Sequence, residues 1–563
     1  MDKRFFLALF LSLIVIAVAQ LLFPPAKRAP GSAISPSGDS SSRPKNIGVP
    51  AAGSSSLPTA NRATAPLLTR ISPTVTRTVG QAVAETTTVN TAKATYKLAN
   101  IGAAPVSIVM RDYRNRSVAE GLVDLAAEGS PLLGYRLVTP GDTIDLSKVP
   151  FALSRASNAG GVETLTYDAS IKNDTVSITY AISQDTAASY VIGVNGRVKG
   201  PSGQAYLLID LPRTLRPAEA DTTADYRTLA YSFKPERDHA RSVLFGGLEP
   251  GERTLEPGPL SWVAVKSKYF VLGILAPTNG TLFSEVMLGG GPRTSKVATN
   301  ATATVVESIK NNSFAFDIYA GPQESQRLAR MGRDFDHVNP YGWRFLQGVV
   351  HPIASKVIQA LLWMHNRLNL SYGWVLVILG ILVRFALWPL NQSTMRSSLK
   401  MQELQPKLAA AQKKYPDPVQ QREAIMKVYH DAGVSPFAGL TGCLPALLPM
   451  PILFALFFVF QNTIEFRGVP FLWLHDISIK DPVYILPLLM GASMYLLSWI
   501  GMRNAPPNPQ AKMMGYMFPV MMTVVLLNMA SGLNLYYTAQ NIAALPQQWL
   551  LARERAKARP KGG

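Results

Sequence analysis

One charged residue stands inside the apolar segments of this chain, and it is the side chain best placed to do chemistry. Residues 372–390 form an apolar run of 19 residues in which Arg384 is the only charge. A helix of that length spans about 28 Å, close to the hydrocarbon thickness of a bilayer. An arginine inside such a helix costs about 2.5–3.5 kcal/mol on insertion scales. Two explanations stay open: the side chain snorkels past Pro389 to the interface, or a hydrated cavity uses its charge.

The charge has no acidic partner within the membrane. Six apolar runs, at residues 5–23, 372–390, 440–461, 483–501, 513–529 and 533–551, contain no Asp, Glu, Lys or His. Transporter relays normally pair such charges, so we expect Arg384 to meet water, lipid phosphate or a visiting negative group. Milder polar residues in these runs either line the same cavity or hydrogen-bond between helices. The candidates for that cavity are Ser493, Ser498, Thr523, Asn528, Asn534, Tyr536, Tyr537, Gln540 and Asn541.

Other chemistry has little support in the sequence. Cys443 is the only cysteine, and the six histidines are scattered, so we predict no metal site. No G-x-x-x-x-G-K-[ST] motif is present, and we predict no nucleotide or other cofactor. The chain has 563 residues, 47% hydrophobic and 16% charged, which is typical of a membrane protein with a soluble part. The net charge of +19 fits nucleic acid, but it also fits basic loops that face anionic lipid.

The N-terminal part must be anchored and exported. Lys3 and Arg4 precede the apolar run Phe5–Phe23, which is too long for a cleaved signal peptide, so we predict a signal anchor over residues 1–23. Residues 24–90 are rich in Pro, Ser, Ala, Thr and Gly, which predicts a flexible linker.

Residues 91–330 carry short alternating runs separated by turn signals, the pattern of an antiparallel β-sandwich. The clearest runs are Val106–Met110, Tyr135–Thr139, Val162–Tyr167, Thr175–Ile182, Ala205–Leu211, Thr302–Ile309 and Phe314–Tyr319. We find no catalytic constellation among them, because His239 is the only candidate imidazole base. A structural or partner-binding domain is therefore expected.

Residues 331–370 connect this domain to the membrane. Within them, residues 341–368 are predicted to form an amphipathic helix at the outer interface. Its predicted apolar stripe consists of Leu346, Val349, Ile353, Val357, Leu361 and Met364. A packed helix that closes the β domain is the alternative.

The remaining five runs form a membrane core at residues 371–551. Short-loop charges orient it: the 391–439 loop holds seven Lys or Arg, whereas the 462–482 loop holds only Arg467 and Lys480 beside three acidic residues. Both termini, including the basic tail 552–563, are therefore predicted to be cytoplasmic. The 391–439 loop reads as a basic helical hairpin, with Asp417 capping its second helix and Pro418 at the first position.

At this point the residues resemble a known family, the bacterial YidC membrane-protein insertases of the Oxa superfamily in their Gram-negative form. The resemblance covers essentially the whole chain. In the membrane core it rests on Val383-Arg384, Trp388-Pro389-Leu390, Gly442-Cys443-x-Pro445, Met450-Pro451-Ile452, Asp481-Pro482-x-Tyr484-Ile485-Leu486-Pro487 and Ser531-Gly532-Leu533-x-Leu535-Tyr536-Tyr537. In the exported part it rests on Trp262-Val263-Ala264, Lys268-Tyr269-Phe270 and Tyr319-x-Gly321-Pro322.

The resemblance implies a fold and a site. The fold is a polytopic α-helical membrane protein with six transmembrane helices, a five-helix insertase core and a periplasmic β-supersandwich similar to sugar mutarotases. The site is a positively charged groove, open to cytosol and lipid, that contains Arg384, Tyr536, Tyr537 and Ser498. Arg384 matches the family's groove arginine and Tyr537 its functional tyrosine, whereas Ser498 stands where an amide is usual. Gly380 stands where a relative often has a hydroxyl.

The expected function is insertion and chaperoning of membrane proteins in the inner membrane, without enzymatic activity. The resemblance implies nascent transmembrane segments as substrates and the Sec translocase, with its accessory subunits, as a partner. It also implies a ribosome contact, which the short tail after Trp549 argues against as a strong one. Anionic lipids are expected at the basic loops, and specific nucleic-acid binding is not. The alternatives are a solute or ion transporter, which should show paired intramembrane charges, and a sugar enzyme acting through His239.

Overall fold

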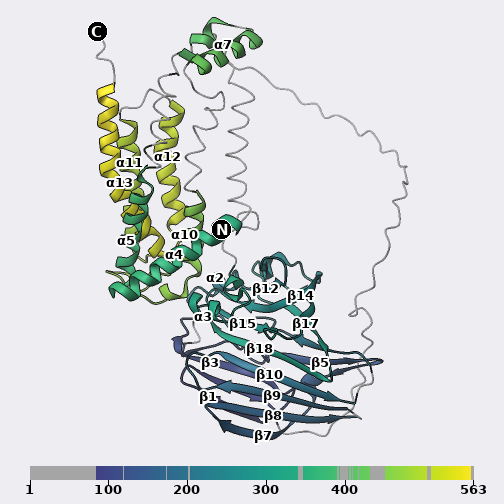
Figure 1. Ribbon diagram of the computed structural model, residues 1–563. Helices are drawn as coiled ribbons and strands as arrows, with labels where there is room; N and C mark the ends of the chain where they lie inside the picture. Colours follow the sequence, from purple (N-terminus) through teal and green to yellow (C-terminus); the bar gives the residue numbers. More distant parts are fainter. Residues whose placement is uncertain are drawn as a thin grey trace, which may run out of the picture. The chain divides into compact units, whose positions relative to one another are not determined.

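The protein is described here from a computed structural model (Figure 1). The described residues are 84–389 apart from 118–119, 173, 201–202, 294 and 340–346, and then 392, 404, 407–408, 410–415, 417–431, 450–503 and 509–558. The predicted signal anchor, residues 24–83 of the predicted linker, and the Gly442–Pro445 motif lie outside them, as does most of the first hairpin helix.

The N-terminal half of the described chain is built from two antiparallel sheets. The first has four strands in the order β1 (Thr86–Asn90), β2 (Ala94–Ala99), β3 (Ala104–Arg114) and β4 (Leu122–Asp124). The second has 14 strands. Its main path runs β6 (Asp142–Asp145), β5 (Gly134–Thr139), β11 (Ala205–Asp210), β17 (Ala301–Ile309), β16 (Phe283–Gly290), β14 (Arg253–Lys266), β15 (Phe270–Leu275), β18 (Ser313–Pro322), β10 (Val191–Lys199), β9 (Asp174–Ser183), β8 (Val162–Ile171) and β7 (Ala152–Ala159). β12 (Ala230–Pro235) branches from β14 and pairs with β13 (Arg241–Leu244).

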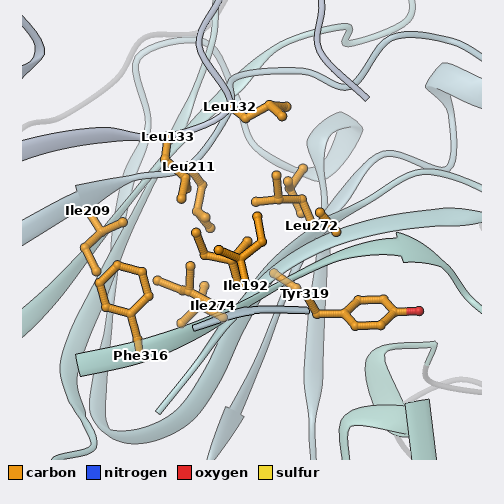
Figure 2. Close-up of a cluster of buried hydrophobic side chains, with 14 of the residues drawn as sticks. Leu132, Leu133, Ile192, Ile209, Leu211, Leu272, Ile274, Phe316 and Tyr319 are labelled. Carbon is orange, nitrogen blue, oxygen red and sulfur yellow. The ribbon is translucent and has the colours of Figure 1, made fainter. Parts of the chain in front are cut away.

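Side-chain alternation explains why these segments pair. In β9 the residues Val176, Ile178 and Tyr180 are fully buried, and the intervening Ser177 and Thr179 are only half-buried. Figure 2 shows where such side chains meet: Ile192 of β10, Ile274 of β15 and Phe316 of β18 gather in one buried cluster. Burial of this apolar surface is the main stabilising contribution to the domain.

The seven predicted strand runs all fall on strands, but other parts of the pattern were misread. β1 begins at Thr86, inside the range predicted as linker, so the domain starts earlier than residue 91. It also ends later than residue 330, because Phe335 and Val338 of the short helix η4 (Phe335–Val338) are fully buried in the β-domain core. The run of β15 was missed because all six of its residues are buried, which removes the alternation that marks a strand.

The C-terminal half is helical (Figure 1). Its helices are α4 (Gln347–Leu368), α5 (Tyr372–Ala386), α7 (Pro418–Asp431), α10 (Met450–Asn462), α11 (Ile485–Met502), α12 (Pro509–Leu526) and α13 (Ser531–Ala558). Asp417 caps α7 as predicted, since its carboxylate accepts the backbone N–H groups of Val419 and Gln420 at 3.4 and 3.5 Å. α13 continues to Ala558, within the segment predicted as the basic tail 552–563.

The predicted count of six transmembrane helices is not established by these helices. Within the described residues, only α11 has both the length and the hydropathy to cross a bilayer by composition alone. Tyr372–Ala386, Pro451–Asn462 and Gly515–Leu526 are apolar but shorter. α5 ends at Ala386 rather than at Leu390. Pro389, shortly after this end, has no backbone N–H group with which to extend the hydrogen bonds of α5.

The buried stripe of α4 matches the predicted one only in part. Leu361 and Met364 are buried as predicted, but Val349 is 52% exposed, and Val350, Ala354 and Ile358 are buried in its place. This stripe packs against α10 in the apolar cluster of the membrane helices, so the helix belongs to that cluster. The sequence pattern allowed both stripes, because apolar residues occupy neighbouring positions 349 and 350, and packing on α10 selects one.

Candidate functional site

The site is positioned by the close contact of α5 with α13. A Cβ added at Gly380 would lie 2.9 Å from the Tyr536 carbonyl oxygen and 3.3 Å from the Ala539 Cβ. Nearer the start of both helices, a Cβ added at Gly532 would lie 3.1 Å from the Leu376 side chain. The contacts advance together along both helices, so α5 and α13 run parallel. The absence of a side chain at Gly380 lets the two backbones approach, as small residues do between membrane helices.

Arg384 follows Gly380 by one helical turn and reaches across to α13. Its Nη2 donates a hydrogen bond of 2.7 Å to Oε1 of Gln547. Because Gly380 lies opposite Ala539, the backbone of Gln547 is about one turn, or 6 Å, further along than the backbone opposite Arg384. The guanidinium therefore extends toward the C-terminal ends of both helices, where it makes a defined hydrogen bond.

The pair retains unused hydrogen-bonding capacity. Gln547 is 2% exposed, and Arg384 is half-buried. Arg384 Nε and Gln547 Nε2 are both buried without a hydrogen-bond partner among the described residues. Both atoms are donors, so the pair presents N–H groups beside a full positive charge.

Gln547 was missed by the sequence analysis. It lies within the predicted run 533–551, but the sequence does not distinguish this amide from the other polar residues of that run. Arg384 and Gln547 are 163 positions apart, and their distance in space depends on the register between α5 and α13, which no local sequence pattern reveals. The available signal was that Arg384 needs a partner and that the end of the last run holds an uncharged amide.

The structure places the predicted tyrosines away from the arginine. Tyr536 is fully buried, and its ring lies 5.7 Å from Phe460 and 5.3 Å from Tyr537. Tyr537 is half-buried and precedes Gln547 by ten residues, about 15 Å along α13. Ser498 is half-buried on α11. Arg384 and Gln547 are thus in direct contact, whereas the two tyrosines occupy a different level of the bundle.

Several predicted cavity residues instead join helices to one another. Asn541 Nδ2 donates to Ser493 Oγ at 3.1 Å, and Ser493 Oγ donates to the Met490 carbonyl at 2.7 Å, which links α13 to α11. Asn534 Nδ2 donates to the Leu526 carbonyl of α12 at 3.1 Å. These contacts follow the structural alternative expected for polar residues in membrane helices.

The loop between α10 and α11 covers the opposite ends of α5 and α13. Backbone N–H groups of Ser531 and Gly532, at the start of α13, donate to the carbonyls of Ile479 and Ile477 at 2.7 and 2.8 Å. The Phe471 ring occupies the space where a Cβ at Gly373 would lie. These contacts satisfy helix-end donors and close this end of the helix pair.

The outer face of α11 and α12 is apolar. Leu488, Trp499, Val520 and Val524 are all exposed there. A hollow of about 710 Å³ between the two helices is lined by these side chains and by Gly491, Ala492, Tyr495, Leu496, Pro519 and Thr523. An apolar surface of this extent is typical of contact with lipid or with another apolar chain.

Comparison with known proteins identifies two family matches. Residues 86–353 match the family described as YidC periplasmic domain, and residues 363–558 match the family described as 60Kd inner membrane protein. The membrane protein insertase YidC of Chlorobium luteolum is 31% identical over 446 residues, which are 73% of this chain and 72% of the relative. The same-named protein of Chlorobaculum tepidum is 28% identical over 497 residues, covering 82% and 81%.

Solved structures give weaker likenesses. A crystal structure of an active YidC insertase with its first transmembrane domain resolved has 17% identity and a TM-score of 0.32, covering 84% of this chain and 93% of that one. A galactose mutarotase-like protein from Lactobacillus casei has 9% identity and a TM-score of 0.30, covering 42% of this chain and 100% of that one. The supersandwich comparison therefore stays a prediction.

Proposed function

This chain belongs to the YidC family of inner-membrane protein insertases, which are not enzymes, and from that membership we propose that it inserts proteins through a groove in which Arg384 supplies the charge. The groove receives the polar end of a nascent transmembrane segment with its short exported part. The path through hydrocarbon becomes shorter, and the segment then enters the lipid because its apolar surface is buried there.

The observation that carries this proposal is the partner of Arg384. Gln547 holds the guanidinium at 2.7 Å with a neutral amide, so the hydrogen bond fixes the side chain without cancelling its charge. A carboxylate in the same place would leave a neutral pair. The apolar runs contain no Asp or Glu, and the positive charge therefore remains available to a negative or polar group that enters the groove.

Two further features agree with a groove that has one closed end. The loop before α11 covers the starts of α5 and α13, so we place the entrance of the groove toward the other end of the pair. The exposed apolar face of α11 and α12 offers a surface compatible with lipid and with an apolar substrate helix. We assign Tyr536, Tyr537 and Ser498 to the groove on the family resemblance, with Tyr536 acting through packing because it is fully buried.

The wider setting follows from charge and family. We propose that both termini face the cytoplasm, because Lys and Arg concentrate in the 391–439 loop and the C-terminal tail. The same charges favour anionic lipids, and the family favours the Sec translocase as a partner for part of the substrates. A ribosome contact would be weak. A transporter is disfavoured, since its coupling would need paired intramembrane charges.

Site-specific photocrosslinking to a stalled nascent membrane protein tests the proposed groove. Photoreactive residues at Ser498 and Tyr537 should crosslink to the nascent transmembrane segment. A matched probe at Leu153, an exposed apolar residue of the β domain, should not. Crosslinks from Leu153 alone would contradict the groove as the substrate path.

A further inference from the structure

We propose that Gln547 is a specificity-determining residue, which holds Arg384 with its carbonyl oxygen and, together with Arg384 Nε, donates to a carboxylate of the incoming polypeptide. The inference rests on the proposed function, because it concerns which groups the groove recognises. It goes beyond the groove arginine itself by assigning half of the site to the last helix.

The orientation of the amide is fixed by chemistry. A guanidinium has only donors, so Gln547 has to offer its oxygen to Arg384, and the 2.7 Å contact joins Arg384 Nη2 to Oε1. The Gln547 amide nitrogen then lies on the other branch of the side chain with its two hydrogens unused. The orientation therefore presents a donor and not an acceptor.

Burial makes these unused donors informative. Gln547 is 2% exposed, and its Nε2 and the Nε of Arg384 lack hydrogen-bond partners among the described residues. Buried donors that stay unpaired are costly, and native proteins retain few of them. The two donors belong to side chains that are hydrogen-bonded to each other, and a positive charge lies beside them. Such a pair is suited to bind one acceptor that carries negative charge.

A carboxylate of the substrate fits better than a lipid phosphate. A carboxylate has two oxygens that accept hydrogen bonds from neighbouring donors, and it stands on a slender side chain. The phosphate of a phospholipid bears two bulky ester substituents. These substituents would hinder its approach to the amide of Gln547, which is only 2% exposed. An Asp or Glu beside the transmembrane segment of a substrate can approach with less displacement.

Substitution at Gln547 separates recognition from simple positioning. Gln547→Glu keeps an oxygen for Arg384 but neutralises its charge, so it removes both parts of the proposed carboxylate site. Gln547→Met leaves the charge of Arg384 and removes the amide donor, so a purely positioning role predicts that both substrates slow equally, whereas recognition predicts a loss specific to the Asp substrate. The assay uses the full-length protein in vesicles and two single-span substrates that differ by one Asp or Asn in the short exported segment.

For Gln547→Glu, we expect the insertion rate of the Asp substrate to fall at least about tenfold relative to the Asn substrate, as loss of a charged hydrogen bond implies. Gln547→Met, which has similar length and no donor, should lose the same preference and replaces the Glu variant if that one fails to fold. Gln548→Glu is the matched control, since it adds the same charge one residue further along and should leave the ratio unchanged.

The outcomes are distinct. An Asp-to-Asn rate ratio that stays at its wild-type value with Gln547→Met would overturn the inference and leave Gln547 a positioning residue. A ratio that disappears when phosphatidylglycerol is replaced by phosphatidylcholine would assign the acceptor to lipid and also overturn it. Failure of the proposed groove gives a different result, in which Arg384→Ala inserts both substrates normally.

Discussion

Replacing Arg384 with alanine should abolish most insertion while leaving the amount of folded protein nearly unchanged. The substitution removes an insertion cost of about 2.5–3.5 kcal/mol. It also leaves the buried amide of Gln547 without its partner, which costs about 1–3 kcal/mol. These two effects act in opposite directions and are of similar size, so the net change in stability is small.

The effect on substrate capture has no such compensation. A hydrogen bond to a charged group contributes about 1.5–3 kcal/mol, so its loss should weaken capture about tenfold to 100-fold. Arg384→Lys keeps the charge but lacks the planar fork that bonds Gln547 and substrate together, so we expect a smaller loss. Arg384→Glu should be the most severe, above all for substrates with acidic exported segments.

The assay measures insertion of a short-tailed, Sec-independent substrate into vesicles that hold equal amounts of each variant. Arg503→Ala serves as the control, because Arg503 at the end of α11 packs 5.3 Å from the Trp499 ring and its loss changes the net charge equally. Wild-type rates for both Arg384→Ala and Arg384→Glu would refute the reasoning. Snorkelling alone would then be the better account of this arginine.

Three other predictions concern the rest of the chain. Deleting residues 86–338 should leave insertion largely intact. A further deletion of α4 should abolish insertion, because α4 packs into the membrane-helix cluster. Loss of insertion by the first deletion, at normal protein levels, would contradict this prediction. Shortening the hairpin around Tyr415 should reduce substrate crosslinking more than it reduces stability. The capping variant Asp417→Ala should lower the free energy of unfolding by only about 1 kcal/mol and keep crosslinking. Equal crosslinking by both variants would make the loop a simple connector. Burial raises the pKa of Glu307 to about 8 from 4.5, so the folded state holds this proton more tightly, and thermal stability should fall as pH rises between these values, by at most about 1.4 kcal/mol per unit. Glu307→Gln should flatten that slope in unfolding scans of the detergent-solubilised chain, and an unchanged slope would assign it to another group.

The β domain was predictable where one face of a strand is buried and the other is not. Val176, Ile178 and Tyr180 of β9 illustrate this, because the polar residues between them reveal the pleat. β15 escaped because burial on both faces erases the alternation. For α4 the sequence predicted an amphipathic helix, but adjacent apolar residues left its orientation to be decided by packing.

The candidate site shows a similar limit. Arg384 could be found from the sequence, since a lone charge in an apolar run requires an explanation. Its partner could not, because Gln547 is defined by the register of α5 against α13 and not by any local pattern. Tyr536 and Tyr537 came from the family resemblance, and in the structure Tyr537 lies about 15 Å along α13 from Gln547, the hydrogen-bond partner of Arg384.

The contact at Gly380 restricts the direction in which a finished substrate can depart. With the Tyr536 carbonyl only 2.9 Å from a Cβ position on α5, no space remains between these two helices for a third one about 10 Å across. Opening that seam would also break the hydrogen bond between Arg384 and Gln547. Departure into the bilayer therefore has to occur on another side of the bundle. Any larger residue at position 380 would disturb both the contact between α5 and α13 and the position of Arg384.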